Sequence, residues 1–99
     1  MMDGDQSSAS AIVRRVCTIC NKLGLHARAA VKFAKAAAQF DAQVSVRKNG
    51  TEVAAGDIME LLMLGAGPGT VIELSARGPQ AAEAITALAS LIECKFDET

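Results

Sequence analysis

The single histidine of the chain, His26, has a sequence context that suits phosphoryl chemistry. It follows Gly24 and Leu25, and a run of strong helix formers begins at Ala27. The first backbone N–H groups of a helix lack intrahelical partners and carry partial positive charge, so they favour an anion. Arg28 adds a guanidinium fork that fits phosphate oxygens. Because an imidazole nitrogen can accept a phosphoryl group, the pattern indicates a nucleophile beside an anion cradle; an ordinary surface or capping histidine remains the alternative.

Three cysteines offer a second candidate for chemistry. Cys17 and Cys20 form a C-x-x-C, which is typical of a redox pair or of half a metal site. However, they lie in a β-branched run that predicts a strand, where residues three apart point to opposite faces. We therefore expect no metal site, with Cys17 a small core residue beside Ile19 and Cys94 part of a terminal helix.

Composition excludes several classes of protein. A chain of 99 residues with 51% hydrophobic residues predicts one folded domain, for which we take residues 13–99, after a disordered polar tail at residues 1–12. The net charge of −1 and 3% aromatic content argue against nucleic acid as a partner. No apolar run reaches the roughly 20 residues of a membrane span. The start MMDGDQSSAS does not resemble a secretory signal, so we expect a cytoplasmic protein.

Periodicity and turn residues predict seven elements. They are strands at Arg14–Cys20, Ala42–Arg47, Thr51–Ala54 and Thr70–Ala76, and helices at Ala27–Gln39, Asp57–Leu64 and from Gly78-Pro79 to Cys94. Asn49-Gly50 is a strong hairpin signal, so at least part of the sheet is antiparallel. The order βαββαβα predicts an α+β open-faced sandwich with all helices on one face of the sheet.

The first and the last predicted helices each have an apolar side. The buried sides comprise Ala30, Phe33, Ala34 and Ala37 in the first helix and Ala81, Ile85, Leu88 and Ile92 in the last. The polar side of the first helix carries Arg28, Lys32, Lys35 and Gln39. This basic stripe either steers acidic partners or is an ordinary solvated helix face.

The short helix at Asp57–Leu64 is too apolar to be buried on all sides. We expect Asp57 to cap it and Leu61 and Leu64 to face the core. The remaining apolar residues, Ile58, Met59, Leu62 and Met63, then form a candidate docking surface for partner proteins. The alternative is that a loop or the last helix covers them.

The run Gly24-Leu25-His26-Ala27-Arg28-Ala29-Ala30 resembles the phosphorylation-site motif of the HPr family. HPr is the histidine phosphocarrier of the phosphoenolpyruvate-dependent phosphotransferase system. The resemblance extends over residues 13–94 and implies a four-stranded antiparallel sheet with three helices on one face. The segments GTE (residues 50–52), LLML (residues 61–64) and GPQ (residues 78–80) look more like the nitrogen-related regulatory branch.

The resemblance implies a carrier that takes a phosphoryl group from phosphorylated Enzyme I onto Nδ1 of His26. The carrier then passes it to an EIIA-type protein. Arg28 and the amides of Ala27 and Arg28 are expected to hold the phosphoryl group, with no cofactor. Such a carrier acts stoichiometrically, needs only a monomer, and docks its partners on Ile58, Met59, Leu62 and Met63, with Lys35 nearby. We expect a regulatory role rather than one dedicated to a single sugar.

Two residues depart from the family pattern. Ala29 stands where many members have Pro, a residue that presets the first helical turn. Asp57 stands at the position of a regulatory serine, so control by phosphorylation of that serine is expected to be absent.

Two alternatives of other classes make opposite predictions. A thiol or metal domain built on Cys17 and Cys20 requires the cysteines and is indifferent to His26. A non-catalytic, ferredoxin-like interaction domain does not need His26 either.

Overall fold

The computed structural model describes residues 11–98. Its elements are β1 (Ile12–Thr18), α2 (Ala27–Ala37), β2 (Gln43–Lys48), β3 (Thr51–Ala54), α3 (Ile58–Met63), β4 (Val71–Arg77), α4 (Ala81–Glu93) and a one-turn 3-10 helix η1 (Lys95–Asp97). The order matches the prediction. The expected disordered tail lies mostly outside the described residues, and its last residue, Ile12, belongs to β1.

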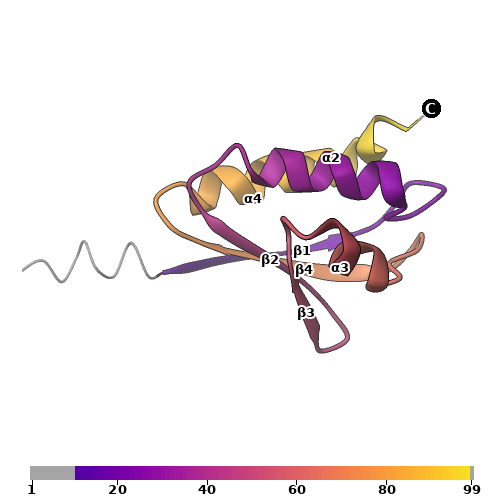
Figure 1. Cartoon of the computed structure of the whole chain (residues 1–99), viewed down its shortest axis with the longest axis horizontal. Coiled ribbons are helices and arrows are strands. Elements are labelled where there is room, and N and C mark those ends of the chain that lie inside the picture. Colours follow the sequence, from indigo (N-terminus) through magenta and orange to yellow (C-terminus); the bar gives the residue numbers. More distant parts are fainter. Residues whose placement is uncertain (1–10, 99) are drawn as a thin grey trace, which may run out of the picture.

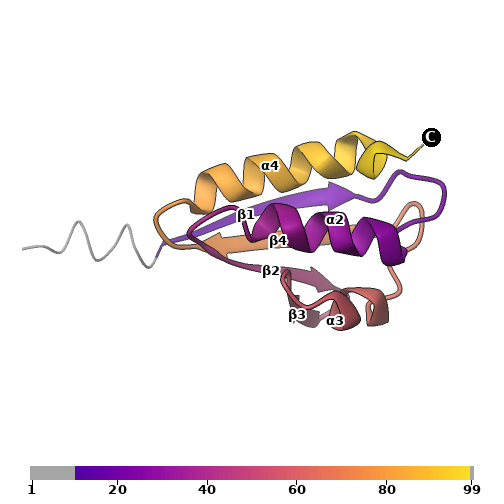
Figure 2. The same ribbon diagram turned by 45° about the horizontal axis from the view of Figure 1, so that its top comes forward.

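The four strands form one sheet in the order β1-β4-β2-β3, and every neighbouring pair is antiparallel. Figures 1 and 2 show α2 and α4 lying side by side over one face of this sheet, and no helix of residues 11–98 lies on the opposite face. The short α3 packs against β3 and α2, beneath the N-terminal half of α2 in both views. The architecture is the open-faced α+β sandwich that the sequence predicts.

The hairpin between β2 and β3 forms for a local reason. Asn49 and Gly50 have φ values of 49° and 84°, and such a pair of left-handed residues gives the turn whose twist suits a two-residue hairpin. The register then sets Val46 opposite Val53 and Arg47 opposite Glu52.

The core lies between the sheet and the two long helices. Its largest fully buried side chains include Phe33 of α2, Leu88 and Ile92 of α4, and Ile72 and Leu74 of β4. Burying one such side chain stabilises the fold by about 1.5–3 kcal/mol. All four residues expected on the buried side of α2 are buried, and so is Ala29. Small alanines allow the backbone of α2 to pack closely against its neighbours.

Several predicted boundaries were wrong. β1 spans Ile12–Thr18 rather than Arg14–Cys20, because at Ile19 the chain leaves the ladder and exchanges backbone hydrogen bonds with Gly69 and Thr70. α2 ends at Ala37, before Gln39. Cys94 is the C-cap of α4 rather than part of it, since the next three residues adopt left-handed φ values of 53–58° and turn the chain.

Candidate functional site

The loop before α2 fixes the position of His26. The amide of Leu25 donates to the carbonyl of Ala66 at 2.8 Å, and the amide of His26 donates to the carbonyl of Gly24 at 2.9 Å. Gly24 has a φ of +68°, and a Cβ there would lie 2.7 Å from the Ala66 oxygen and from the Gly67 Cα. Only glycine fits this close approach, which ties the histidine loop to the turn after α3.

His26 is the N-cap residue of α2, but its side chain does not cap the helix. Its backbone is extended (φ −80°, ψ −178°), and its carbonyl accepts the first helical bond from Ala30 at 2.8 Å. Within residues 11–98, nothing accepts from the amides of Ala27, Arg28 or Ala29, and the first turn contains no acidic residue. This helix start therefore has free donors and an uncompensated positive end.

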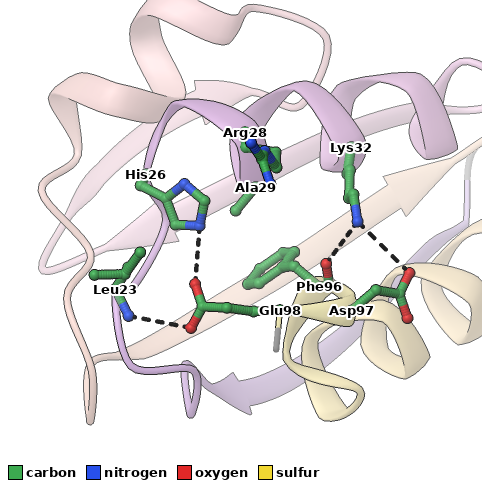
Figure 3. A pocket seen from close by; sticks show the side chains of 8 residues that line it. All are labelled: Leu23, His26, Arg28, Ala29, Lys32, Phe96, Asp97 and Glu98. Carbon is green, nitrogen blue, oxygen red and sulfur yellow. Dashed lines mark hydrogen bonds and ion pairs between the residues drawn. The ribbon is translucent and has the colours of Figure 1, made fainter.

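A carboxylate from the far end of the chain contacts the histidine ring (Figure 3). Oε2 of Glu98 lies 3.0 Å from Nε2 of His26 and 3.2 Å from Nδ2 of Asn21, while its Oε1 accepts from the Leu23 amide at 3.4 Å. Desolvation raises the pKa of Glu98, but the hydrogen bonds from Asn21, His26 and the loop amides of Lys22 and Leu23 outweigh it and lower that pKa below its usual value. Glu98 is therefore ionised at neutral pH.

The segment Lys95–Glu98, which we term the C-terminal clamp, is held in place independently of Glu98. Phe96 is only 2% exposed and belongs to the hydrophobic core. The ammonium group of Lys32 donates to the Phe96 carbonyl at 2.9 Å and lies 3.9 Å from the carboxylate of Asp97. Lys32, one of the residues expected in the basic stripe of α2, thus binds the clamp, whereas Arg28 and Lys35 are exposed.

His26, Arg28 and the clamp surround one hollow (Figure 3). The cavity has a volume of about 400 Å³ and is lined by Leu23, His26, Arg28, Ala29, Lys32, Phe96, Asp97 and Glu98. Arg28 is exposed, and no carboxylate among the described residues pairs with its guanidinium. Ala29, which stands in place of Pro, lies in the first turn of α2, and that helix begins at Ala27.

The start of α3 is closed, unlike that of α2. Oδ1 of Asp57 accepts from the Glu60 amide at 3.0 Å, so the predicted cap is confirmed, and Oε1 of Glu60 accepts from the Ala54 amide at 3.4 Å. At the other end of α3, the ammonium group of Lys48 donates to the carbonyls of Leu64 and Gly65 at 2.9 and 3.3 Å. Both ends of this short helix are thus satisfied by side chains.

The apolar surface of α3 is largely exposed. Ile58, Met59 and Met63 are 37%, 67% and 80% exposed. Leu61 and Leu64 are buried as expected. Leu62 differs from the expectation because it packs partly against the core. The term docking patch below denotes Ile58, Met59, Leu62 and Met63, and Lys35 is exposed on the neighbouring helix.

All three cysteines have free thiols and form no disulfide bond. Cys17 packs against the core, and burial raises the pKa of its thiol, which disfavours the reactive thiolate. Cys20 lies outside β1, with its Sγ 3.4 Å from the Ile92 carbonyl. Among residues 11–98, no three His, Cys, Asp or Glu side chains are grouped so that they could hold a metal. No helix in the same range has the length and hydropathy to cross a membrane.

Sequence reasoning missed Glu98 and Asn21, although both contact the candidate site. The separation between His26 and Glu98 is 72 residues, and no local pattern links them. One signal was present in the sequence. Phe96 follows the end of the last predicted helix, and a large aromatic residue there indicates that this segment packs against the core.

Comparisons with known proteins agree with the resemblance noted from the motif. A family model described as the PTS HPr component phosphorylation site matches residues 13–94. Phosphocarrier protein NPr of Shewanella violacea is 44% identical over 86 residues, which cover 87% of this chain and 94% of that protein. Phosphocarrier protein HPr of Neisseria meningitidis is 48% identical over 87 residues, which cover 88% and 98%. The crystal structure of HPr-C-His from Thermoanaerobacter tengcongensis matches with a TM-score of 0.84 at 44% identity, covering 88% of this chain and 98% of that one.

Proposed function

The chain belongs to the HPr family of phosphotransferase-system phosphocarriers, and on that premise we propose that His26 is its phosphoryl acceptor. Phosphorylated Enzyme I is the proposed donor and an EIIA-type protein the proposed recipient. The observation that carries the proposal is the open start of α2, where His26 stands beside amides and an Arg28 guanidinium that have no partner among residues 11–98. An anion is the ligand that such an arrangement favours.

The transfer is a simple exchange of bonds to phosphorus. The lone pair of Nδ1 forms a bond to phosphorus while the donor's bond to phosphorus breaks, and the electron pair of that bond stays with the donor. The reverse exchange with a histidine of the recipient restores the Nδ1 lone pair. Arg28 and the amides of Ala27 and Arg28 stabilise the phosphoryl oxygens during both exchanges. No cofactor takes part.

The docking patch supports a role in partner binding. Exposed Met59 and Met63 have flexible, polarisable side chains that adapt to several surfaces, and α3 lies against α2 close to the acceptor. Lys35 adds a positive charge nearby. We place Enzyme I and the EIIA-type protein alternately on this surface, with the carrier as a cytoplasmic monomer.

The decisive experiment measures intact mass after incubation with phosphoenolpyruvate and Enzyme I. We expect one acid-labile phosphoryl adduct on the wild-type protein. His26→Ala should carry none, although its circular dichroism spectrum should match that of the wild type. Adducts of equal yield on both proteins would place the chemistry elsewhere. No adduct on folded wild type with several Enzyme I proteins would indicate a binding domain instead.

The docking surface has its own test. Met63→Gln should raise the apparent KM of Enzyme I for this protein by about tenfold, because the substitution removes an apolar side chain from the patch. Val16→Gln is the matched control, since Val16 is 64% exposed in β1, away from α3. Equal KM values for the two variants would remove α3 from the proposed interface.

The regulatory assignment also remains a proposal. Relatives named NPr and HPr match at 44% and 48% identity, so overall identity does not separate the nitrogen-related branch from the sugar branch. Asp57 lacks a hydroxyl and its carboxylate serves as a helix cap, which supports the absence of control by a serine kinase at this position.

A further inference from the structure

We infer that Glu98 is a positioning residue that holds the neutral His26 ring in its Nε2–H tautomer and leaves the lone pair of Nδ1 free. The assignment deepens the proposed function, because the free lone pair is the one that attacks phosphorus. It concerns a side chain that is remote in sequence and that no motif around His26 includes.

The hydrogen-bond chemistry of the two groups leads to this tautomer. An ionised carboxylate only accepts hydrogen bonds, so the 3.0 Å contact between Glu98 Oε2 and His26 Nε2 requires a proton on Nε2. A neutral imidazole has one N–H, so Nδ1 is then the acceptor nitrogen. Figure 3 shows that the other ring nitrogen lies on the side away from Glu98, and no hydrogen bond to Nδ1 occurs within residues 11–98.

Glu98 is preorganised for this contact. Asn21 is fully buried, and its Nδ2 donates both to the Gly24 carbonyl at 2.7 Å and to Glu98 at 3.2 Å. The Leu23 amide holds the second carboxylate oxygen. Buried Phe96 anchors the backbone two residues earlier, and the Glu98 side chain is only 16% exposed. The carboxylate therefore meets the ring without having to order a mobile terminus.

The same contact serves the transfer itself. When Nδ1 forms its bond to phosphorus, the ring becomes electron-poor and the Nε2–H group carries part of the resulting positive charge. The carboxylate at 3.0 Å stabilises that charge without removing the proton. When the bond to phosphorus breaks again, its electron pair returns to Nδ1 and the ring is neutral with its proton still on Nε2. The cycle therefore needs no external base.

The experiment is nitrogen NMR of the His26 ring in the unphosphorylated full chain, at a pH where the ring is neutral. We expect wild type to show the Nε2–H tautomer almost alone. In Glu98→Gln, the amide can donate to or accept from Nε2, so the Nδ1–H population should rise several-fold. Glu98→Asp restores the carboxylate and should restore the wild-type signature at least in part. Glu83→Gln, which removes an exposed carboxylate in the first turn of α4 that does not line the cavity, is the matched control and should leave the ring signals unchanged.

The rate of phosphorylation by Enzyme I is the second readout. It should fall by about tenfold in Glu98→Gln and stay at the wild-type value in Glu83→Gln. A proton on Nδ1 in the wild type, or wild-type tautomer populations in Glu98→Gln, would overturn the assignment. An altered tautomer with an unchanged rate would overturn its role in transfer. Failure of the proposed function is recognised separately, because wild type then takes up no phosphoryl group whatever its tautomer.

Discussion

The starts of the helices α2 and α3 are built in opposite ways. At α3, the side chain of Asp57 accepts from the first turn, and Glu60 reaches back to the preceding strand. At α2, the N-cap residue is His26, whose side chain turns away to Glu98 and leaves the first amides free. A capped start contributes stability, whereas an open start can hold a ligand. The chain therefore uses one helix start for stability and leaves the other open to a ligand.

The largest expected effect comes from making α2 resemble α3. His26→Asn replaces the proposed acceptor with a good capping residue, so phosphorylation by Enzyme I should be lost entirely. The new cap should nevertheless make His26→Asn about 1 kcal/mol more stable than His26→Ala, which lacks both functions. Urea denaturation of the two variants measures this difference. Equal stabilities would show that the amides of α2 do not donate to the Asn side chain.

Glycine substitutions in the loops that precede α2 and α3 should differ strongly in their effect on the free energy of unfolding. Gly24→Ala should cost about 2–4 kcal/mol of unfolding free energy, since alanine disfavours a positive φ and its Cβ would meet the Ala66 carbonyl. Gly56→Ala, before α3, has open space and no positive φ, and should change stability by less than about 1 kcal/mol. Thermal unfolding of the pair tests the contrast, which fails if both variants lose similar stability.

Removing the closed cap should have a smaller effect. Asp57→Ala should destabilise the protein by about 1 kcal/mol, because the Glu60 amide loses its acceptor. Uptake of the phosphoryl group by His26 should remain near the wild-type rate at saturating Enzyme I. A large loss of rate in a folded Asp57→Ala sample would mean that Asp57 acts in the transfer as well as in folding.

The smallest effect is the acid sensitivity of the clamp. Because the pKa of Glu98 is lowered in the folded state, its contribution to stability is present above the ordinary carboxyl pKa and disappears as the pH falls through the lower folded value. The stability difference between wild type and Glu98→Gln should therefore shrink between pH 5 and strongly acid solution. The two proteins differ only at this side chain, so the comparison isolates Glu98. A difference that grows in acid would contradict the lowered pKa.

Local signals explain which features the sequence could predict. Asn49-Gly50 defines its turn within two residues, and the spacing of Phe33 and its neighbouring alanines defines the buried side of α2. His26 before a run of helix formers likewise places a histidine at a helix start. The pairing of Glu98 with His26 and of Lys32 with the clamp depends on tertiary packing across more than 60 residues. Left-handed φ values at Lys95, Phe96 and Asp97 are rare for such residues, so pattern rules extend no further than Cys94.

The side-chain links at both ends of α3 have a kinetic consequence for partner binding. A six-residue helix is too short to persist alone in water, but Asp57 holds its first turn and Lys48 ties its last carbonyls to the end of β2. In the proposed docking, a partner therefore meets this patch already formed, and binding does not wait for a segment to order. The association rate constant should then be that of two preformed surfaces. The residence time should depend on how well each partner's surface packs against the exposed side chains of Met59 and Met63.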